Sequence, residues 1–187
     1  PPLGCDILLV ALHLPSKLHS NEKDQISGST RVAELIREAE QEVGHNRTIV
    51  IGDFNMNPFE ASMIGADGFH AVMTQKIARK VSRTVSQKEK LYFYNPMWGR
   101  MGDFSSADPP GSYYYQNSGY FSYFWNTFDQ VLLRPNLLDF FSHDDLSIIP
   151  EIVNKSLLND NKIIDKKHFS DHLPVKIKLA LEKETGK

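Results

Sequence analysis

Residues 48–58 read TIVIGDFNMNP, and this stretch indicates the fold class. Its first four residues form an apolar, mostly β-branched run, which is typical of a strand buried on both faces. Gly52 lets the backbone turn where the strand ends. Asp53 and Asn55 are two residues apart, so in extended geometry their side chains point to the same side. An acid and an amide at the end of a buried strand mark a place where α/β proteins put chemistry.

The segments on either side of this stretch predict an order of strand, helix, strand and helix. Residues 6–14 (DILLVALHL) read as a buried strand that ends at His13, and residues 16–29 read as a polar loop. Apolar residues at helical spacing over 32–43 predict a helix that stops at Gly44. This alternation favours an α/β protein.

The second half of the chain predicts shorter elements. Residues 57–60 (NPFE) combine a cap, a proline and an acid, which predicts a short helix. The basic run 76–90 is expected to be partly helical, with one face in water. Tyrosine-rich segments on both sides of Asn117 and Gly119 predict a hairpin. The remaining expected elements are strands at 127–133, 146–152 and 175–181 and a short helix at 136–141.

Length and composition indicate one globular domain over residues 1–187, since 41% of the residues are hydrophobic. The formal net charge of −2 gives no general basic field for nucleic acid or anionic lipid. Cys5 is the only cysteine, which excludes an internal disulfide and a cysteine metal cage. The sequence has neither a membrane-spanning run nor a signal-peptide pattern, so we expect a soluble protein and favour the cytoplasm.

The aromatic residues are concentrated in one region. All seven tyrosines and both tryptophans lie between Tyr92 and Trp125. Such rings can stack on bases or sugars while the basic run 76–90 follows phosphates. They can equally fill the interior of a sheet, and we expect most of them to be core.

Four separated segments carry polar residues beside apolar strands, namely LVALHLPSK, IVIGDFNMNP, TFDQVLLRP and FSDHLPV. Their polar residues are, in chain order, His13, Asp53, Asn55, Asp129, Asp171 and His172. This series resembles the endonuclease/exonuclease/phosphatase superfamily, which includes DNase I-like nucleases, sphingomyelinases and inositol polyphosphate 5-phosphatases. The resemblance implies an α/β (α+β) fold in which a two-sheet β-sandwich is flanked by helices, and it implies metal-dependent hydrolysis of a phosphate ester.

One feature departs from the family pattern. The family carries an Asn and a metal-binding Glu well upstream of its first His, whereas only twelve residues precede His13 and none is Glu. The chain therefore resembles the C-terminal portion of such a domain, without its N-terminal strands. We expect it to be weakly active or inactive alone. We also expect it to form a homodimer that covers the exposed apolar sheet surface.

The resemblance also implies a role for each polar residue. Asp53 would orient or deprotonate the attacking water, and Asn55 would donate to a developing oxyanion. His13 and His172 would hold phosphoryl oxygens. The resemblance further makes Asp129 the group that orients the His172 imidazole, and Asp171 a ligand of Mg²⁺ or Mn²⁺. Without the motif, Asp53 and Asn55 would read as turn residues, and Asp171 and His172 as a loop acid and a capping histidine. Asp129 would read as a strand-edge acid and His13 as a structural histidine.

Three alternatives stay open. His168 and His172 have the spacing of helical zinc ligands, although Pro174 disfavours a helix there. The chain could instead be a non-catalytic binding or scaffold module that keeps the fold. A serine hydrolase has no supporting elbow motif. The substrate is also open among DNA, RNA, phosphoinositide and sphingolipid.

Overall fold

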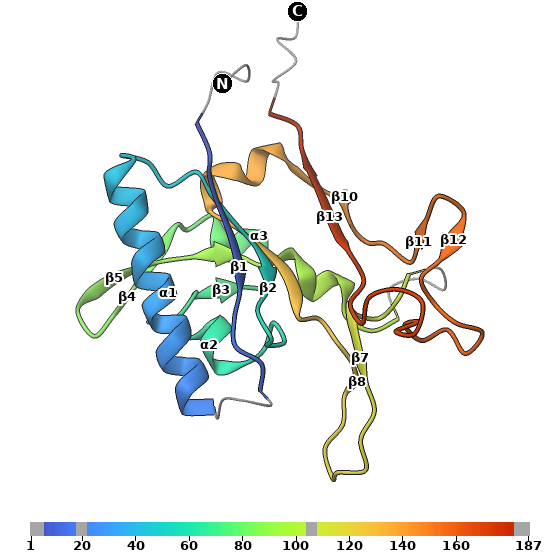
Figure 1. Cartoon of the computed structure of the whole chain (residues 1–187). Coiled ribbons are helices and arrows are strands. Elements are labelled where there is room, and N and C mark those ends of the chain that lie inside the picture. The colour runs from blue at the N-terminus through green and yellow to red at the C-terminus, as the bar shows by residue number, and fades with distance from the viewer. Residues whose placement is uncertain (1–5, 18–21, 104–107, 182–187) are drawn as a thin grey trace, which may run out of the picture.

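A five-stranded sheet forms the centre of the molecule. The structure, a computed structural model, describes residues 6–17, 22–103 and 108–181 (Figure 1). Strand β2 lies between β1, to which it is parallel, and β9, to which it is antiparallel. In spatial order the strands are β1 (Leu8–His13), β2 (Thr48–Asp53), β9 (Asp129–Leu133), β6 (Phe93–Tyr94) and β3 (Ala71–Val72). The chain is thus a mixed α/β protein rich in sheet and with few helices, as the sequence predicts at this coarse level.

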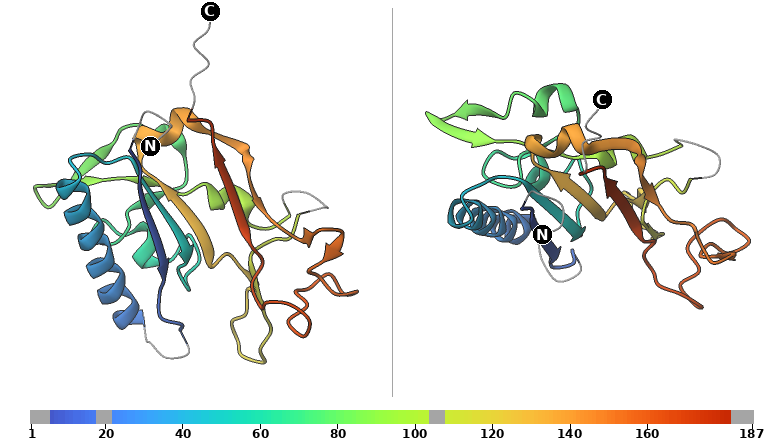
Figure 2. Two further views of the ribbon diagram at one scale, coloured as in Figure 1. Left: turned by 45° about the horizontal axis from the view of Figure 1, so that its top comes forward. Right: turned by 90° about the horizontal axis from the view of Figure 1, so that it is seen from above.

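The central sheet separates two packed layers, because side chains alternate between the faces of a strand. On one face, Val50 and Leu132 share a buried core with Ala33 and Ile36 of helix α1 (Glu22–Glu42). The opposite face packs against an antiparallel pair of strands, β10 (Phe141–Ile148) and β13 (Val175–Leu179). The central-sheet residues on that face are Ile49, Ile51, Val131 and Leu133. Figure 2 shows the helix and the strand pair on opposite sides of the sheet.

The first strand differs from the buried strand that the sequence predicts. Strand β1 is the last strand on its side of the sheet among the described residues, and its side chains alternate between half-buried and exposed. Leu9 is 63% exposed, on the face that β10 and β13 cover elsewhere. An apolar run therefore does not distinguish a central strand from an edge strand whose outer face lacks a covering layer.

Helix α1 starts earlier than predicted, because residues 22–29 are helical rather than part of a loop. Most of these residues face solvent, so they lack the apolar periodicity that marks the later turns. The buried Ser29 hydroxyl donates to the carbonyl oxygen of Ile26 at 3.0 Å, which satisfies it within the helix.

A buried ion pair holds α1 on the sheet. Arg134, just after β9, donates from Nε and Nη2 to the two carboxylate oxygens of Glu40 at 2.8 and 2.9 Å. The hydroxyl of Thr48 in β2 donates to the same carboxylate at 2.6 Å. The guanidinium carbon of Arg134 lies 3.7 Å from the centre of the Phe93 ring. Because loss of one partner would leave a buried charge, this network fixes the helix against the first residue of β2.

The basic run 76–90 is mainly a hairpin rather than a helix. Only α3 (Gln75–Ala78) is helical, and β4 (Ser82–Val85) pairs with β5 (Lys88–Leu91). The two turn residues between them, Ser86 and Gln87, both have positive φ, as tight two-residue hairpin turns require.

Several short elements shift from their predicted bounds. The helix expected at the NPFE segment begins later, as α2 (Ala61–Ile64), and the helix expected at 136–141 is the 3₁₀ helix η2 (Pro135–Phe140). Another 3₁₀ helix is η1 (Pro96–Arg100). The strand expected at 146–152 is divided, because β10 ends at Ile148 and the following residues form the hairpin of β11 (Glu151–Ile152) and β12 (Lys155–Ser156).

The aromatic region forms a projecting hairpin of β7 (Tyr113–Tyr115) and β8 (Phe124–Asn126). It extends from the body past the C-terminal ends of β1 and β2 (Figure 1). Of the tyrosines and tryptophans, only Tyr92 and Tyr94 are buried, so the prediction that most are core is wrong. Tyr114 and Trp125 at the middle of the paired strands are half-buried against the core, whereas Tyr115, Tyr120 and Tyr123 farther out on the projecting hairpin are exposed.

Candidate functional site

Three of the predicted site residues lie side by side at one end of the central sheet. His13 is the register partner of Asp53 across β1 and β2, and Asp53 is the partner of Asp129 across β2 and β9. Their positions along the strands place all three on the face that carries β10 and β13. Strand register thus joins residues that are far apart in the sequence.

A glycine allows the first two strands to approach just before this row. Gly52 has a φ of +145°, and a Cβ at this position would lie 1.9 Å from the carbonyl oxygen of Leu12. Any other residue would clash with the β1 backbone and would strain its own. Gly52 therefore sets the close contact that puts His13 next to Asp53.

Asp53 is held by the turn that follows it. The backbone N–H of Asn55 donates to Oδ1 of Asp53 at 2.7 Å, and the Asn55 side-chain amide donates to Oδ2 at 3.0 Å. The same amide donates to the carbonyl oxygen of Leu14 at 2.8 Å. Asn55 is buried, and both of its amide hydrogens are used in these contacts. In this arrangement Asn55 positions Asp53, and it has no amide hydrogen left for an oxyanion.

His172 reaches the row from the loop before β13. Its Nδ1 donates to Oδ2 of Asp129 at 2.7 Å, and its Nε2 lies 4.0 Å from Oδ2 of Asp53. The backbone of His172 forms an antiparallel β-bridge with Tyr113, and the centres of the two rings are 4.7 Å apart. Next in the chain, the N–H of Leu173 donates to the carbonyl oxygen of Ser112 at 2.8 Å. The loop that carries His172 is therefore fastened to the base of the β7–β8 hairpin.

Opposing effects set the proton affinities of the two central groups. Burial lowers the pKa of His172, but the hydrogen bond with Asp129 and the charges of the nearby aspartates outweigh burial and raise this pKa. Burial raises the pKa of Asp53, and the negative charge of Asp129 raises it further against the lowering by the Asn55 backbone. The site thus pairs an imidazole that favours its cation with a carboxylate of increased basicity.

The two remaining predicted residues are more exposed. The His13 side chain is 77% exposed, and its Nε2 lies 3.4 Å from Oδ2 of Asp53. Asp171 is exposed and, although its charge acts on His172, it does not belong to the group of metal-ligand candidates that the structure brings together. Its predicted role as a metal ligand stays a prediction.

The sequence does not predict the roles of several residues that hold the site in place. Ser112 is buried, and its hydroxyl accepts from the N–H of Asp129 at 3.0 Å. Asn57 does not cap a helix. Its Oδ1 accepts from the N–H of Thr127, and its Nδ2 donates to Asn126, each at 2.9 Å. The position of Asn57 inside the GDFNMNP segment is the one signal for its role, since nothing in the sequence identifies its partners, Asn126 at the end of β8 and Thr127 after it.

The structure groups one set of described side chains that could hold a metal ion. Donor atoms of Asp53, Asp129 and His172 lie within 4.8 Å of one another. The two carboxylates are the hard oxygen donors that Mg²⁺ and Mn²⁺ prefer. The helical zinc pair is not formed, because the segment through His168 and His172 consists of turns, and His168 Nδ1 bonds to Asp165 at 2.8 Å.

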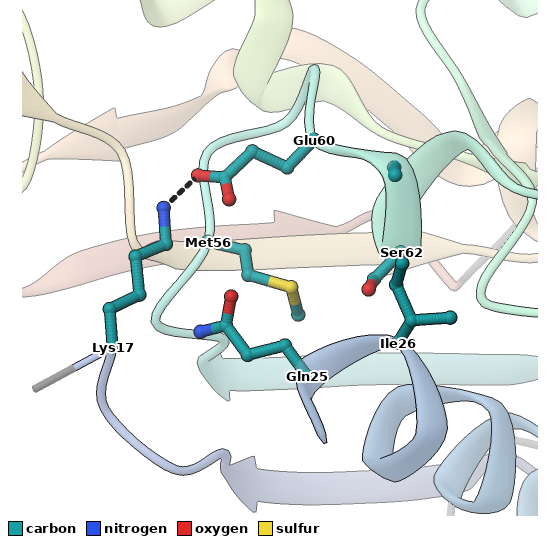
Figure 3. A pocket seen from close by; sticks show the side chains of 7 residues that line it. Lys17, Gln25, Ile26, Met56, Glu60 and Ser62 are labelled. Atoms are coloured by element: carbon teal, nitrogen blue, oxygen red, sulfur yellow. Dashed lines mark hydrogen bonds and ion pairs between the residues drawn. The ribbon is translucent and has the colours of Figure 1, made fainter. Parts of the chain in front are cut away.

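A separate pocket of about 340 Å³ opens between the start of α1 and the loop after β2. Figure 3 shows the ion pair of Lys17 and Glu60 on one side of it, with Gln25 and Met56 also lining it. None of the residues that line this pocket belongs to the cluster around Asp53. The pocket and the polar cluster are therefore different features.

No family model, curated protein or solved structure matches the chain. In the described ranges, no helix combines the length and the apolar character needed to cross a bilayer. Any assignment of function therefore depends on the sequence motifs and on the geometry described above.

Proposed function

We propose that this chain carries the phosphate site of a metal-dependent phosphoric ester hydrolase of the endonuclease/exonuclease/phosphatase type. One observation carries the proposal, namely that the Asp53 carboxylate lies between two imidazoles. Oδ2 of Asp53 is 3.4 Å from Nε2 of His13 and 4.0 Å from Nε2 of His172. Imidazolium groups bind phosphoryl oxygens, and a carboxylate orients and deprotonates water.

Asp53 is the proposed base. In hydrolysis, water attacks phosphorus in line with the leaving oxygen, and the carboxylate accepts the proton of that water. The pKa of Asp53 is raised by burial and by Asp129, which makes the carboxylate a better proton acceptor than an exposed aspartate. Asn55 keeps the carboxylate in place through two hydrogen bonds, so it acts as a positioning residue.

His172 and His13 are the proposed phosphate-binding groups. Asp129 holds Nδ1 of His172 and leaves Nε2 directed toward Asp53, which is where a bound phosphoryl group would lie. The raised pKa of His172 favours the charged form that neutralises phosphoryl oxygens. His13 approaches Asp53 from the other side and is exposed enough to meet a substrate.

The donor set suits a hard divalent cation, and Mg²⁺ or Mn²⁺ is the proposed cofactor. The Asp129 carboxylate would hold it, with Asp171 as the predicted further ligand, so that Asp53 stays free to accept the proton of water. When bound, such an ion neutralises charge on the phosphoryl group and lowers the pKa of water.

We further propose a DNase I-like arrangement for this chain. The support is the order of layers, since α1 covers one face of the central sheet and the β10–β13 pair covers part of the other. The site lies where the row of His13, Asp53 and Asp129 meets the loop before β13. That position is at the edge between the central sheet and the β10–β13 pair.

The test combines ion binding with turnover. Mn²⁺ titration followed by electron paramagnetic resonance should show a site that Asp129→Asn weakens by about tenfold or more. Hydrolysis of bis(p-nitrophenyl) phosphate should be slow, dependent on Mg²⁺ or Mn²⁺, and at the uncatalysed rate in Asp53→Ala. The matched control is Asp165→Asn, which removes a half-buried carboxylate that binds His168 and is not part of the cluster.

The outcomes separate the alternatives. Mn²⁺ binding with no turnover under any metal would support a non-catalytic module in place of a hydrolase. Absence of both ion binding and turnover would contradict the proposed site. Rapid hydrolysis that Asp53→Ala abolishes would instead contradict the expectation that residues 1–187 are weakly active alone.

A further inference from the structure

The tip of the β7–β8 hairpin exposes aromatic rings to an unusual degree. Tyr120 is 103% exposed and Phe121 is 90% exposed, relative to reference values for each residue. Tyr123 and Phe124 follow at 66% and 46%. Large apolar side chains gathered on one projecting turn mark a contact surface, whereas singly scattered ones do not.

The charge pattern of this hairpin indicates what it contacts. Residues 109–128 include no aspartate, glutamate, lysine, arginine or histidine. Proteins bind nucleic acids mainly through cationic side chains that neutralise phosphates, and this segment offers no such side chain. Tyrosine, tryptophan and phenylalanine without charges are instead the composition found where proteins meet the interface of a lipid bilayer.

Cations lie nearby, but at the base of the hairpin rather than at its tip. Nζ of Lys166 lies 4.9 Å from the centre of the Tyr113 ring, and Nζ of Lys17 lies 5.6 Å from the centre of the Phe128 ring. A lipid bilayer has a matching arrangement, because its apolar region lies inside and its phosphates lie at the surface. A hairpin that inserts tip-first would therefore place its aromatic rings deepest and these lysines at the level of the headgroups.

The hairpin is joined directly to the proposed site. The backbone of Tyr113 bridges to that of His172, and its ring contacts the imidazole. Tyr123 packs edge-on against Phe59 with ring centres 5.4 Å apart, which ties the hairpin to the loop after β2. The hairpin extends past the strand ends that carry His13 and Asp53 (Figure 1). Docking of its tip would thus bring the polar cluster to the surface that the tip enters.

We propose that Tyr120 and Phe121 anchor the protein in the interface of a lipid bilayer, so that the site meets phosphodiesters of lipid headgroups. The assignment of a lipid substrate rests on the proposed function, whereas the anchoring does not. The anchor is apolar and reversible, since it consists of two rings on one turn.

The experiment measures binding of residues 1–187 to phosphatidylcholine vesicles by co-sedimentation. Wild-type protein should bind, and 0.5 M salt should leave binding nearly unchanged because the anchor carries no charge. The double variant Tyr120→Ser/Phe121→Ser should bind about tenfold or more weakly. The matched control is Leu35→Ser, which removes an exposed apolar side chain from α1 and should bind as wild type does. Circular dichroism checks that both variants are folded.

The outcomes test the membrane anchor separately from the proposed hydrolase function. Equal vesicle binding by the double variant and the wild type would overturn the proposal, as would binding of single-stranded DNA in place of vesicles. Undiminished vesicle binding by Asp53→Asn would support an anchor that is independent of the chemistry. If the protein hydrolyses a water-soluble phosphodiester without binding vesicles, the anchor fails and the proposed function stands.

Discussion

The polar cluster at the end of the central sheet and the tip of the β7–β8 hairpin are neighbours, but their side chains differ in how far they are constrained. In the cluster, Asp53 receives two hydrogen bonds from Asn55, and His172 is held by Asp129. At the tip, Tyr120 and Phe121 are almost fully exposed. In the proposed roles, the cluster meets a phosphate at fixed distances and needs several constraints for each group, whereas the rings at the tip enter a soft interface and need only exposure.

The polar cluster and the hairpin also differ in which contacts hold them in place. The cluster inherits its geometry from strand register, because His13, Asp53 and Asp129 are direct neighbours across β1, β2 and β9. The hairpin inherits its direction from two contacts, one at Tyr113 in its base and one at Tyr123 in the loop just before β8. Changes in the sheet should therefore damage both regions, while changes at the tip should leave the cluster intact.

The largest effect is expected from Gly52→Ala, which tests the dependence of the cluster on the sheet. The new Cβ would lie 1.9 Å from the Leu12 carbonyl oxygen, at a φ that alanine tolerates poorly. We expect the free energy of unfolding to fall by about 3 kcal/mol or more, measured by urea denaturation.

Gly28→Ala is the matched control for this change. Gly28 lies in α1, and a Cβ there would meet no atom within 4 Å. Alanine should raise the free energy of unfolding by about 0.5–1 kcal/mol, because glycine is a poor helix residue. Equal stability of the two variants would show that the contact between β1 and β2 does not constrain the row.

Asp129→Asn tests the electrostatic part of the cluster. Without the Asp129 carboxylate, the pKa of His172 should fall, because Asp129 supplies the largest of the effects that raise it against burial. The ion pair contributes stability that is fully present below about pH 6.5, the unfolded pKa of histidine, and that is lost as pH rises through the raised folded pKa. At pH 6 the variant should therefore lose about 2 kcal/mol.

The measurement is an NMR titration of the histidine C2 protons in the presence of a chelator, together with urea denaturation at pH 6 and at pH 9. The stability difference between wild type and Asp129→Asn should shrink at the higher pH. His168 is an internal control, because it pairs with Asp165 outside the cluster. An unchanged His172 titration in the variant would contradict the proposed pairing.

The sequence predicts the convergence of the cluster because each of its members ends or precedes an apolar strand. Strand register brings His13, Asp53 and Asp129 together, and the loop before β13 brings His172 to Asp129. The contacts of the Asn55 amide differ from the predicted contact with an oxyanion. Its two hydrogens are taken by Asp53 and by the Leu14 carbonyl, and such contacts depend on the tertiary approach of β1, which no local pattern encodes.

The sequence-based predictions that the structure contradicts share one physical cause. A local sequence pattern does not show which other parts of the protein cover a surface. The start of α1 is polar because it faces water, so it lacks a helical signal. The run 6–14 looks like a buried strand, yet Leu9 in β1 is exposed. The aromatic segment looks like core, yet it projects from the body. In each case the missing information is the position of other layers.

Leu9→Lys tests whether exposed apolar surface on the sheet behaves differently from exposed rings on the hairpin. We expect the chain to dimerise through the uncovered face of β1, and a lysine there should raise the dimer dissociation constant by about tenfold. Light scattering over a wide concentration range measures this change. Tyr120→Ser/Phe121→Ser should leave the dissociation constant unchanged. A wild-type chain that stays monomeric throughout would contradict the expected dimer.

The smallest effect is expected at the contact between Phe59 and Tyr123, where the hairpin meets the body. A double-mutant cycle with Phe59→Ala and Tyr123→Ala should give a coupling energy of about 0.5–1.5 kcal/mol, as edge-on aromatic pairs do. The corresponding cycle between Phe59 and Phe121 should give a coupling near zero, because Phe121 is almost fully exposed. Urea denaturation measures both cycles. If the two cycles gave equal coupling, the tip would be packed rather than free, and the contrast between an ordered base and an exposed anchor would be wrong.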